Sequence, residues 1–191
     1  NTARYGGGAY LWGYGDKPLL LNNVIAANRA GVAGSGLYVE GISPRLRHNT
    51  LADNVGGDGS GIYVTHDPWG GNSTAALTNT ILVSHSVGLY VDDGSTVTLA
   101  GTLWDNSTDW AGPGTIVTGT VNVWGEAAFV DPAGGDYHLG PGSPALDQGL
   151  DAGVRSDVDF QPRPYLGFDL GADEYWPAGV LKHIYLPLLQ E

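Results

Sequence analysis

The chain contains no cysteine, and only eight of its 191 residues are lysine or arginine, against 20 aspartates and glutamates. The lack of cysteine excludes disulfide bonds, cysteine nucleophiles and thiolate metal sites. The formal net charge of −12 disfavours nucleic acids and anionic lipid surfaces as partners, because such polyanions are bound by clustered cations. No apolar run is long enough to span a bilayer, so no membrane span is expected.

Glycine is abundant, with 31 residues, whereas only 15% of the residues are charged. This composition is typical of an all-β protein with many tight turns. Disorder is excluded because hydrophobic residues make up 42% of the chain and are spread along it.

A short pattern occurs four times in the first half of the chain. Each copy reads Gly, an alanine or aliphatic residue, Tyr and an aliphatic residue, at residues 8–11, 36–39, 61–64 and 88–91. A second pattern that begins with Asn precedes three of these copies, at residues 23–28, 49–54 and 79–83. Each repeat contains about three short alternating runs, which indicate strands that cannot bury their apolar face alone. The repeats therefore predict a stacked solenoid, a parallel β-helix, with one continuous core.

The alternation within the repeats assigns the side chains to two faces. Leu37, Ile62 and Leu89 are expected in one inward column, with the aliphatic residue two positions later beside each. The tyrosines between them should point outward as a ladder, formed by Tyr10, Tyr38, Tyr63 and Tyr90. Asn28 and Asn54 suit left-handed turn positions and can bond to each other. About four to five coils are expected over residues 1–125, an irregular C-terminal cap over 126–179 and an apolar tail over 180–191.

The C-terminal third carries a run of more specific motifs. They are Phe-Val-Asp-Pro at 129–132, Gly-Asp-Tyr-His-Leu at 135–139, Gly-Ser-Pro-Ala-Leu-Asp-Gln-Gly at 142–149, Asp-Val-Asp-Phe-Gln-Pro-Arg-Pro at 157–164 and Asp-Leu-Gly-Ala-Asp-Glu at 169–174. Together with the repeats, this region resembles the choice-of-anchor Q type of C-terminal region on secreted bacterial right-handed parallel β-helix proteins, and the tail resembles those of Chloroflexota. The resemblance implies a right-handed parallel β-helix that is secreted or lies on the bacterial cell surface, and it implies no single activity. Phe160 departs from the pattern, where a glycine is usual.

Acidic residues cluster in the expected cap, at Asp157, Asp159, Asp169, Asp173 and Glu174. Carboxylates of this density are a candidate Ca²⁺ site. The alternative, which we favour, is that Arg163 pairs with one or two of them, so that Asp157, Asp159, Arg163 and Asp169 hold the cap together. The Asp-x-Asp pair should lie on one face of a strand. No other metal or cofactor is expected, because the histidines show no zinc-binding spacing.

No residue is assigned a catalytic role. The outward position after the ladder is occupied by Glu40, Thr65 and Asp92 in successive repeats. The two carboxylates would lie roughly 9–10 Å apart across two strand spacings, a separation that suits an inverting glycosidase. Because this one pair of carboxylates is the evidence for catalysis, an enzyme that degrades neutral polysaccharide is the alternative and not the first interpretation.

The tyrosine ladder with Trp12 is the candidate binding surface. Its rings can stack on neutral sugars or on a neighbouring protein. The competing interpretation is that stacked tyrosines only stabilise the sheet.

The chain is expected to start partway round a coil, because residues 1–8 match residues 28–36 and 54–61. The tail, with Ile184, Leu186 and Leu188, can pack on the coils or add a strand to another copy, which would give head-to-tail filaments. The first hypothesis is therefore a non-catalytic structural or adhesive module, outside the cell or on its surface, that self-associates end to end. The second is a β-helix that binds or degrades neutral polysaccharide.

Overall fold

The computed structural model describes residues 1–13, 17–69 and 71–180, and these parts of the chain are all-β. Strands β1 to β16 form three parallel sheets, and β17 and β18 form an antiparallel pair. The prediction of an all-β protein with parallel strands is confirmed. No helix in the described parts of the chain is long and apolar enough to cross a membrane.

The three parallel sheets are built from equivalent strands of successive repeats, and the short sheet takes its strands from three repeats. The short sheet consists of β1 (Thr2–Tyr5), β5 (Arg29–Ala33) and β9 (Val55–Gly56). The tyrosine sheet consists of β2 (Ala9–Trp12), β6 (Leu37–Glu40), β10 (Ser60–Thr65), β12 (Val87–Val91) and β14 (Thr108–Ala111). The bent sheet consists of β3 (Leu19–Leu21), β4 (Val24–Ala26), β7 (Arg45–Arg47), β8 (Thr50–Ala52), β11 (Thr74–Val83), β13 (Thr96–Asp105), β15 (Thr115–Val117) and β16 (Asn122–Trp124).

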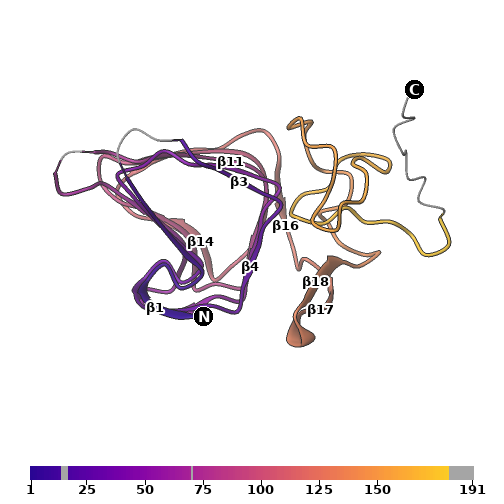
Figure 1. Ribbon diagram of the computed structural model, residues 1–191, viewed down its shortest axis with the longest axis horizontal. Helices are drawn as coiled ribbons and strands as arrows, with labels where there is room; N and C mark the ends of the chain where they lie inside the picture. Colours follow the sequence, from indigo (N-terminus) through magenta and orange to yellow (C-terminus); the bar gives the residue numbers. More distant parts are fainter. Residues whose placement is uncertain (14–16, 70, 181–191) are drawn as a thin grey trace, which may run out of the picture.

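Equivalent residues of successive repeats lie directly opposite each other in these sheets. Ile62 of β10 pairs with Leu37 of β6 on one side and with Leu89 of β12 on the other, as the repeats predict. The strands contributed by one repeat are called a rung below. Seen along the direction in which the rungs stack, the chain follows a closed outline (Figure 1). The bent sheet makes two adjacent sides, with β3 and β11 on one and β4 and β16 on the other, and the tyrosine sheet and the short sheet make the rest.

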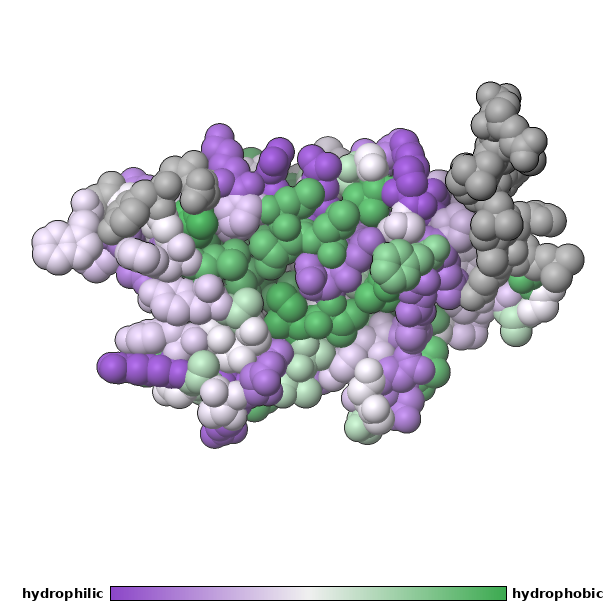
Figure 2. All heavy atoms as spheres, in the orientation of Figure 1, coloured by the Kyte–Doolittle hydropathy of each residue, from purple (hydrophilic) through white to green (hydrophobic). Residues whose placement is uncertain are grey.

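The apolar core fills the space between the three sheets. The inward residues predicted from the repeats are all at most 1% exposed, namely Leu37, Val39, Ile62, Val64, Leu89 and Val91. The bent sheet adds Leu46, Leu77 and Leu99 to the same cluster. Partly buried apolar residues of the first rung, including Leu11 and Leu20, pack against it. Figure 2 shows apolar side chains in the middle of the face that looks along the stack.

The corners of the outline are made by residues with positive φ. Asn22, His48 and Asn79 have φ values of 51°, 51° and 54° and occupy the bend of the bent sheet in successive rungs. At the next corner the left-handed residues are Ala27 and Asp53, with φ of 53° and 55°. The prediction of left-handed geometry at Asn28 and Asn54 is therefore wrong by one position, because the residue before each asparagine adopts it. The asparagine side chains themselves point into the core.

These inward asparagines form a buried polar ladder along the stack. Asn28 Nδ2 donates to Asn54 Oδ1 at 3.0 Å, and Asn54 Nδ2 lies 3.2 Å from His85 Nε2. His85 Nδ1 lies 3.1 Å from Asn106 Oδ1. Because Asn54 offers a donor and Asn106 an acceptor, both ring nitrogens of His85 are satisfied in the neutral form.

The C-terminal region, residues 126–179, lies along the side of the stack and not over its end (Figure 1). It begins with the hairpin of β17 (Phe129–Asp131), the 3-10 helix η1 (Pro132–Gly134) and β18 (Asp136–Leu139). Ala172 N donates to Thr50 Oγ1 at 3.0 Å, and Gly171 N donates to the Asn79 carbonyl at 2.9 Å. The region predicted as a cap is thus a lateral cover that spans several rungs.

A second apolar cluster joins this cover to the bent sheet. Ile81, Val83 and Leu103 point outward from β11 and β13 and are buried against Leu139, Ala145 and Leu170, among others. Residues 81–83 are consecutive apolar residues, which is the pattern of a strand covered on both faces. That run was the sequence signal for a lateral cover.

Replacement of His85 by Asn tests the polar ladder, because the other rungs carry Asn at this position. Burial lowers the pKa of His85 from 6.5 to about 4. The unfolded chain then binds the proton more readily, so folded-state stability should fall as the pH drops from 6.5 towards 4. The loss corresponds to about 3 kcal/mol, since one pKa unit is worth about 1.4 kcal/mol.

Urea unfolding of wild-type protein and His85→Asn at pH 7 and pH 4.5 measures this effect. We expect a smaller loss of stability in acid for the variant. His66→Asn, at an exposed position, is the control and should behave as wild type. Equal acid sensitivity of His85→Asn and wild type would contradict the assignment.

Candidate functional site

The outer face of the tyrosine sheet carries the predicted ladder. Alternation along β2, β6, β10 and β12 turns every second side chain outward, and the parallel register aligns them. Tyr10 lies opposite Tyr38, which lies opposite Tyr63, which lies opposite Tyr90. In the last rung Ala111 occupies the next position of the row, so the ladder ends at Tyr90.

The rings within the ladder stack on one another. Tyr38 and Tyr63 have centroids 5.3 Å apart and Tyr63 and Tyr90 4.8 Å apart, both with an interplanar angle of 9°. Tyr10 meets Tyr38 edge to face at 5.2 Å. Both faces of Tyr63 are therefore covered by neighbouring rings, and the ladder presents ring edges over most of its length.

Open aromatic surface remains at the first rung. Tyr10 is 49% exposed and Trp12 is 56% exposed. Trp12 Nε1 donates to Asp67 Oδ2 at 2.8 Å, which fixes the indole against the sheet face. Trp104 of β13 is, by contrast, fully buried in the core.

A row of oxygen-bearing side chains runs beside the ladder, as the repeats predict. Glu40 pairs with Thr65 in the register, and Thr65 Oγ1 donates to Asp92 Oδ2 at 2.9 Å. Glu40 accepts a hydrogen bond from the Tyr10 hydroxyl. Each carboxylate of the candidate glycosidase pair thus accepts a hydrogen bond from a neighbouring rung, Glu40 from Tyr10 and Asp92 from Thr65.

Burial and these carboxylates keep the phenols protonated. Desolvation, together with the hydrogen bond and charge of Glu40, raises the pKa of Tyr10 to about 12. Burial and the nearby charges of Glu40 and Asp92 raise the pKa values of Tyr38 and Tyr63 further. The ladder therefore offers neutral hydroxyl donors over the physiological pH range.

Arg163 organises the C-terminal region from a buried position. Its side chain is fully buried, and Nη1 lies 3.1 Å from Glu174 Oε2. Nη2 donates to the carbonyls of Gly171 and Ala172 at 3.0 and 2.6 Å. The ion pair expected between Arg163 and one or two of the five clustered carboxylates is made with Glu174.

The aspartates of this region have separate structural roles. Asp157 Oδ1 accepts the backbone N–H groups of Asp159 and Gln161 at 2.9 and 2.7 Å. These residues lie in a turn and not in a strand, so the prediction of one shared strand face is wrong. Asp157 is buried, whereas the Asp159 side chain is 44% exposed, because the turn points them apart.

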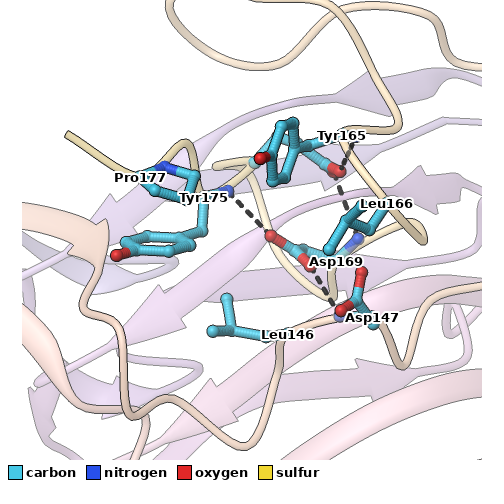
Figure 3. A pocket seen from close by; sticks show the side chains of 8 residues that line it. Leu146, Asp147, Tyr165, Leu166, Asp169, Tyr175 and Pro177 are labelled. Atoms are coloured by element: carbon cyan, nitrogen blue, oxygen red, sulfur yellow. Dashed lines mark hydrogen bonds between the residues drawn. The ribbon is translucent and has the colours of Figure 1, made fainter. Parts of the chain in front are cut away.

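Asp169 lines a small pocket of about 160 Å³ together with Leu146, Tyr165, Leu166 and Pro177 (Figure 3). Its two oxygens accept the backbone N–H groups of Asp147 and Tyr175, each at 2.7 Å. Burial raises the pKa of Asp169 to about 6 and that of Glu174 to about 7. Acidic side chains of the candidate calcium site thus accept hydrogen bonds from different backbone N–H groups, as Asp157 and Asp169 do.

The structure instead groups two of these acids with a histidine that the sequence did not single out. His138 of β18 lies between Asp136 and Asp159, and Asp173 completes the group. Burial alone would lower the pKa of His138, but hydrogen bonds to Asp136 and Asp159 raise it to about 9. The tail residues Ile184, Leu186 and Leu188 lie outside the described residues.

Truncation of Tyr63 tests the ladder as a source of stability. Tyr63→Ala removes two stacked contacts and should lower the free energy of unfolding by about 3 kcal/mol. Tyr10→Ala, at the half-exposed end, should cost about 1 kcal/mol. Urea unfolding measures both variants, and equal losses would show that stacking contributes little.

Searches of the chain against protein-family models, curated proteins and solved structures found no match. The family resemblance drawn from the C-terminal motifs therefore remains an expectation.

Proposed function

We propose that the chain is a right-handed parallel β-helix that serves as a non-catalytic structural or adhesive module outside a bacterial cell or on its surface. Three parallel sheets around one core support this fold. Right-handedness is the rule for connections between parallel strands of one sheet. The extracellular location rests on the resemblance of the C-terminal motifs.

The observation that carries the proposal is the pair of side-chain ladders that run along the stack. The tyrosine ladder lies on the outside, with ring centroids 4.8 to 5.3 Å apart, and the asparagine ladder lies inside. Each ladder links successive rungs by contacts other than the backbone bonds. A stack held in this way is a stiff support on which exposed groups keep a fixed spacing.

Adhesion is assigned to the first-rung end of the tyrosine face. Trp12 and Tyr10 are 56% and 49% exposed there, and Glu40 supplies carboxylate oxygens beside them, whereas the buried Asp67 fixes the Trp12 indole. Aromatic faces stack on sugar rings, and carboxylates accept hydrogen bonds from sugar hydroxyls. The net charge of −12 favours a neutral polysaccharide over a uronate polymer.

Sugar binding is favoured over sugar hydrolysis because both candidate catalytic carboxylates, Glu40 and Asp92, already accept hydrogen bonds from other groups of the sheet face. Glu40 accepts from Tyr10, and Asp92 accepts from Thr65 and from the Asp93 N–H at 2.9 Å. These hydrogen bonds give both carboxylates a structural role on the sheet face that needs no catalytic function. A degrading β-helix remains the alternative.

A panel of soluble neutral polysaccharides tests the adhesive role by affinity electrophoresis. Trp12→Ala should weaken binding about tenfold, the loss of one stacked aromatic contact. Trp124→Ala is the matched control, because Trp124 belongs to β16 of the bent sheet, is 60% exposed and donates to a carboxylate, Asp109 Oδ2, at 2.9 Å. Equal weakening by both variants, or no binding at all, would contradict the assignment.

The same panel, analysed for released reducing ends, separates adhesion from degradation. The proposal expects none with wild-type protein. Release of reducing ends that is lost in Glu40→Gln would establish the enzymatic alternative.

End-to-end association is a second candidate, favoured by the lateral position of residues 126–179. Within the described parts of the chain, β14, β15 and β16 each pair with one neighbour, so their outer edges can accept a strand. Filaments that lengthen with protein concentration should appear by negative-stain microscopy and disappear on deletion of residues 180–191. Filaments of unchanged length in the deletion variant would exclude the tail as the added strand.

A further inference from the structure

Three separate segments of the lateral cover bring metal-binding side chains together. They are β18, which carries His138, the turn that contains Asp159, and the segment that contains Asp173. One ligand atom from each of these residues lies within 4.8 Å of the other two. The group is separate from the tyrosine face, and Asp173 directly precedes Glu174, the partner of Arg163.

The histidine of this group is held in one orientation by a fourth residue. His138 Nδ1 lies 2.5 Å from Asp136 Oδ1, and this leaves Nε2 directed at Asp159 Oδ2, 2.6 Å away. The same Asp136 oxygen accepts the His138 backbone N–H at 3.1 Å. A carboxylate on one imidazole nitrogen, which turns the other nitrogen toward the ion, is the arrangement found around metal-binding histidines. A cation at Nε2 would displace the proton that this nitrogen shares with Asp159.

Asp173 is fixed by the backbone. It is 6% exposed, and its Oδ2 accepts the Leu139 N–H at 2.7 Å. The partly exposed side chains of His138 and Asp159 complete the group on its solvent side. The site thus combines one buried, fixed carboxylate with two groups that a cation can reach.

We propose that His138, Asp159 and Asp173 bind one divalent cation of the zinc class, and that Asp136 positions the His138 ring. Three carboxylates surround a single imidazole here, so the site attracts a cation. The guanidinium of Arg163 is committed to Glu174 and to backbone carbonyls.

The ligand set selects against calcium. Ca²⁺ takes about six to eight oxygen ligands, whereas Zn²⁺ takes nitrogen and oxygen ligands in a set of about four. One imidazole and two carboxylates fit the second pattern and leave one coordination position. A cleft of about 310 Å³, lined by His138, Asp173, Gln161 and Trp176 among others, adjoins the site and can supply a water molecule or a small ligand.

Isothermal titration of metal-free, untagged protein with Zn²⁺ tests the site. We expect one equivalent per chain and a raised melting temperature, because the ion would join three segments of the cover. Ca²⁺ at the same concentration should give neither effect. Asp136→Asn should weaken Zn²⁺ affinity about 10- to 100-fold, the usual effect of losing a residue that orients a metal ligand.

His138→Gln should abolish the single Zn²⁺ equivalent, and His66→Gln, on an exposed loop far along the chain, should not. Asp159→Asn provides a second ligand variant at a partly exposed position if His138→Gln does not fold. Co²⁺ bound in place of Zn²⁺ should show d–d absorption that both ligand variants lose. Unchanged Zn²⁺ affinity in a folded ligand variant, or a Ca²⁺ effect equal to that of Zn²⁺, would overturn the proposal.

Discussion

The parallel register between successive repeats is the constraint on which the rest of the molecule depends. One repeat exposes its apolar face unless the next repeat lies against it. The pairing of Leu37, Ile62 and Leu89 closes the core rung by rung. A slip of one residue would turn these side chains outward and bring the tyrosines inward. The register is therefore fixed by burial as well as by backbone hydrogen bonds.

The same register decides which surface groups are available for contacts. Equivalent positions are brought within about 5 Å, so similar side chains meet and form ladders. Stacking covers the ring faces of Tyr63 and leaves open surface at Tyr10 and Trp12. A long aromatic row on a parallel sheet is thus mainly a stabilising feature, and its end is the place for recognition.

The lateral cover depends on the bent sheet being apolar on both faces. Ile81 and Leu103 would be exposed without Leu139 and Leu170 against them. Because the cover has little regular structure, its backbone amides are satisfied by carboxylates such as Asp157 and Asp169, and its carbonyls by Arg163. Two acids that are not fully used in this way, Asp159 and Asp173, are the ones that meet His138.

The sequence alone determined the strands, the inward columns and the tyrosine row, because each follows from alternation and from a repeat that recurs along the chain. The tertiary structure decided the partner of Arg163, the turn at Asp157 and the lateral position of residues 126–179. It also decided the grouping of His138 with Asp159 and Asp173. These contacts join residues that share no periodicity, so only the packing of the cover against the bent sheet brings them together.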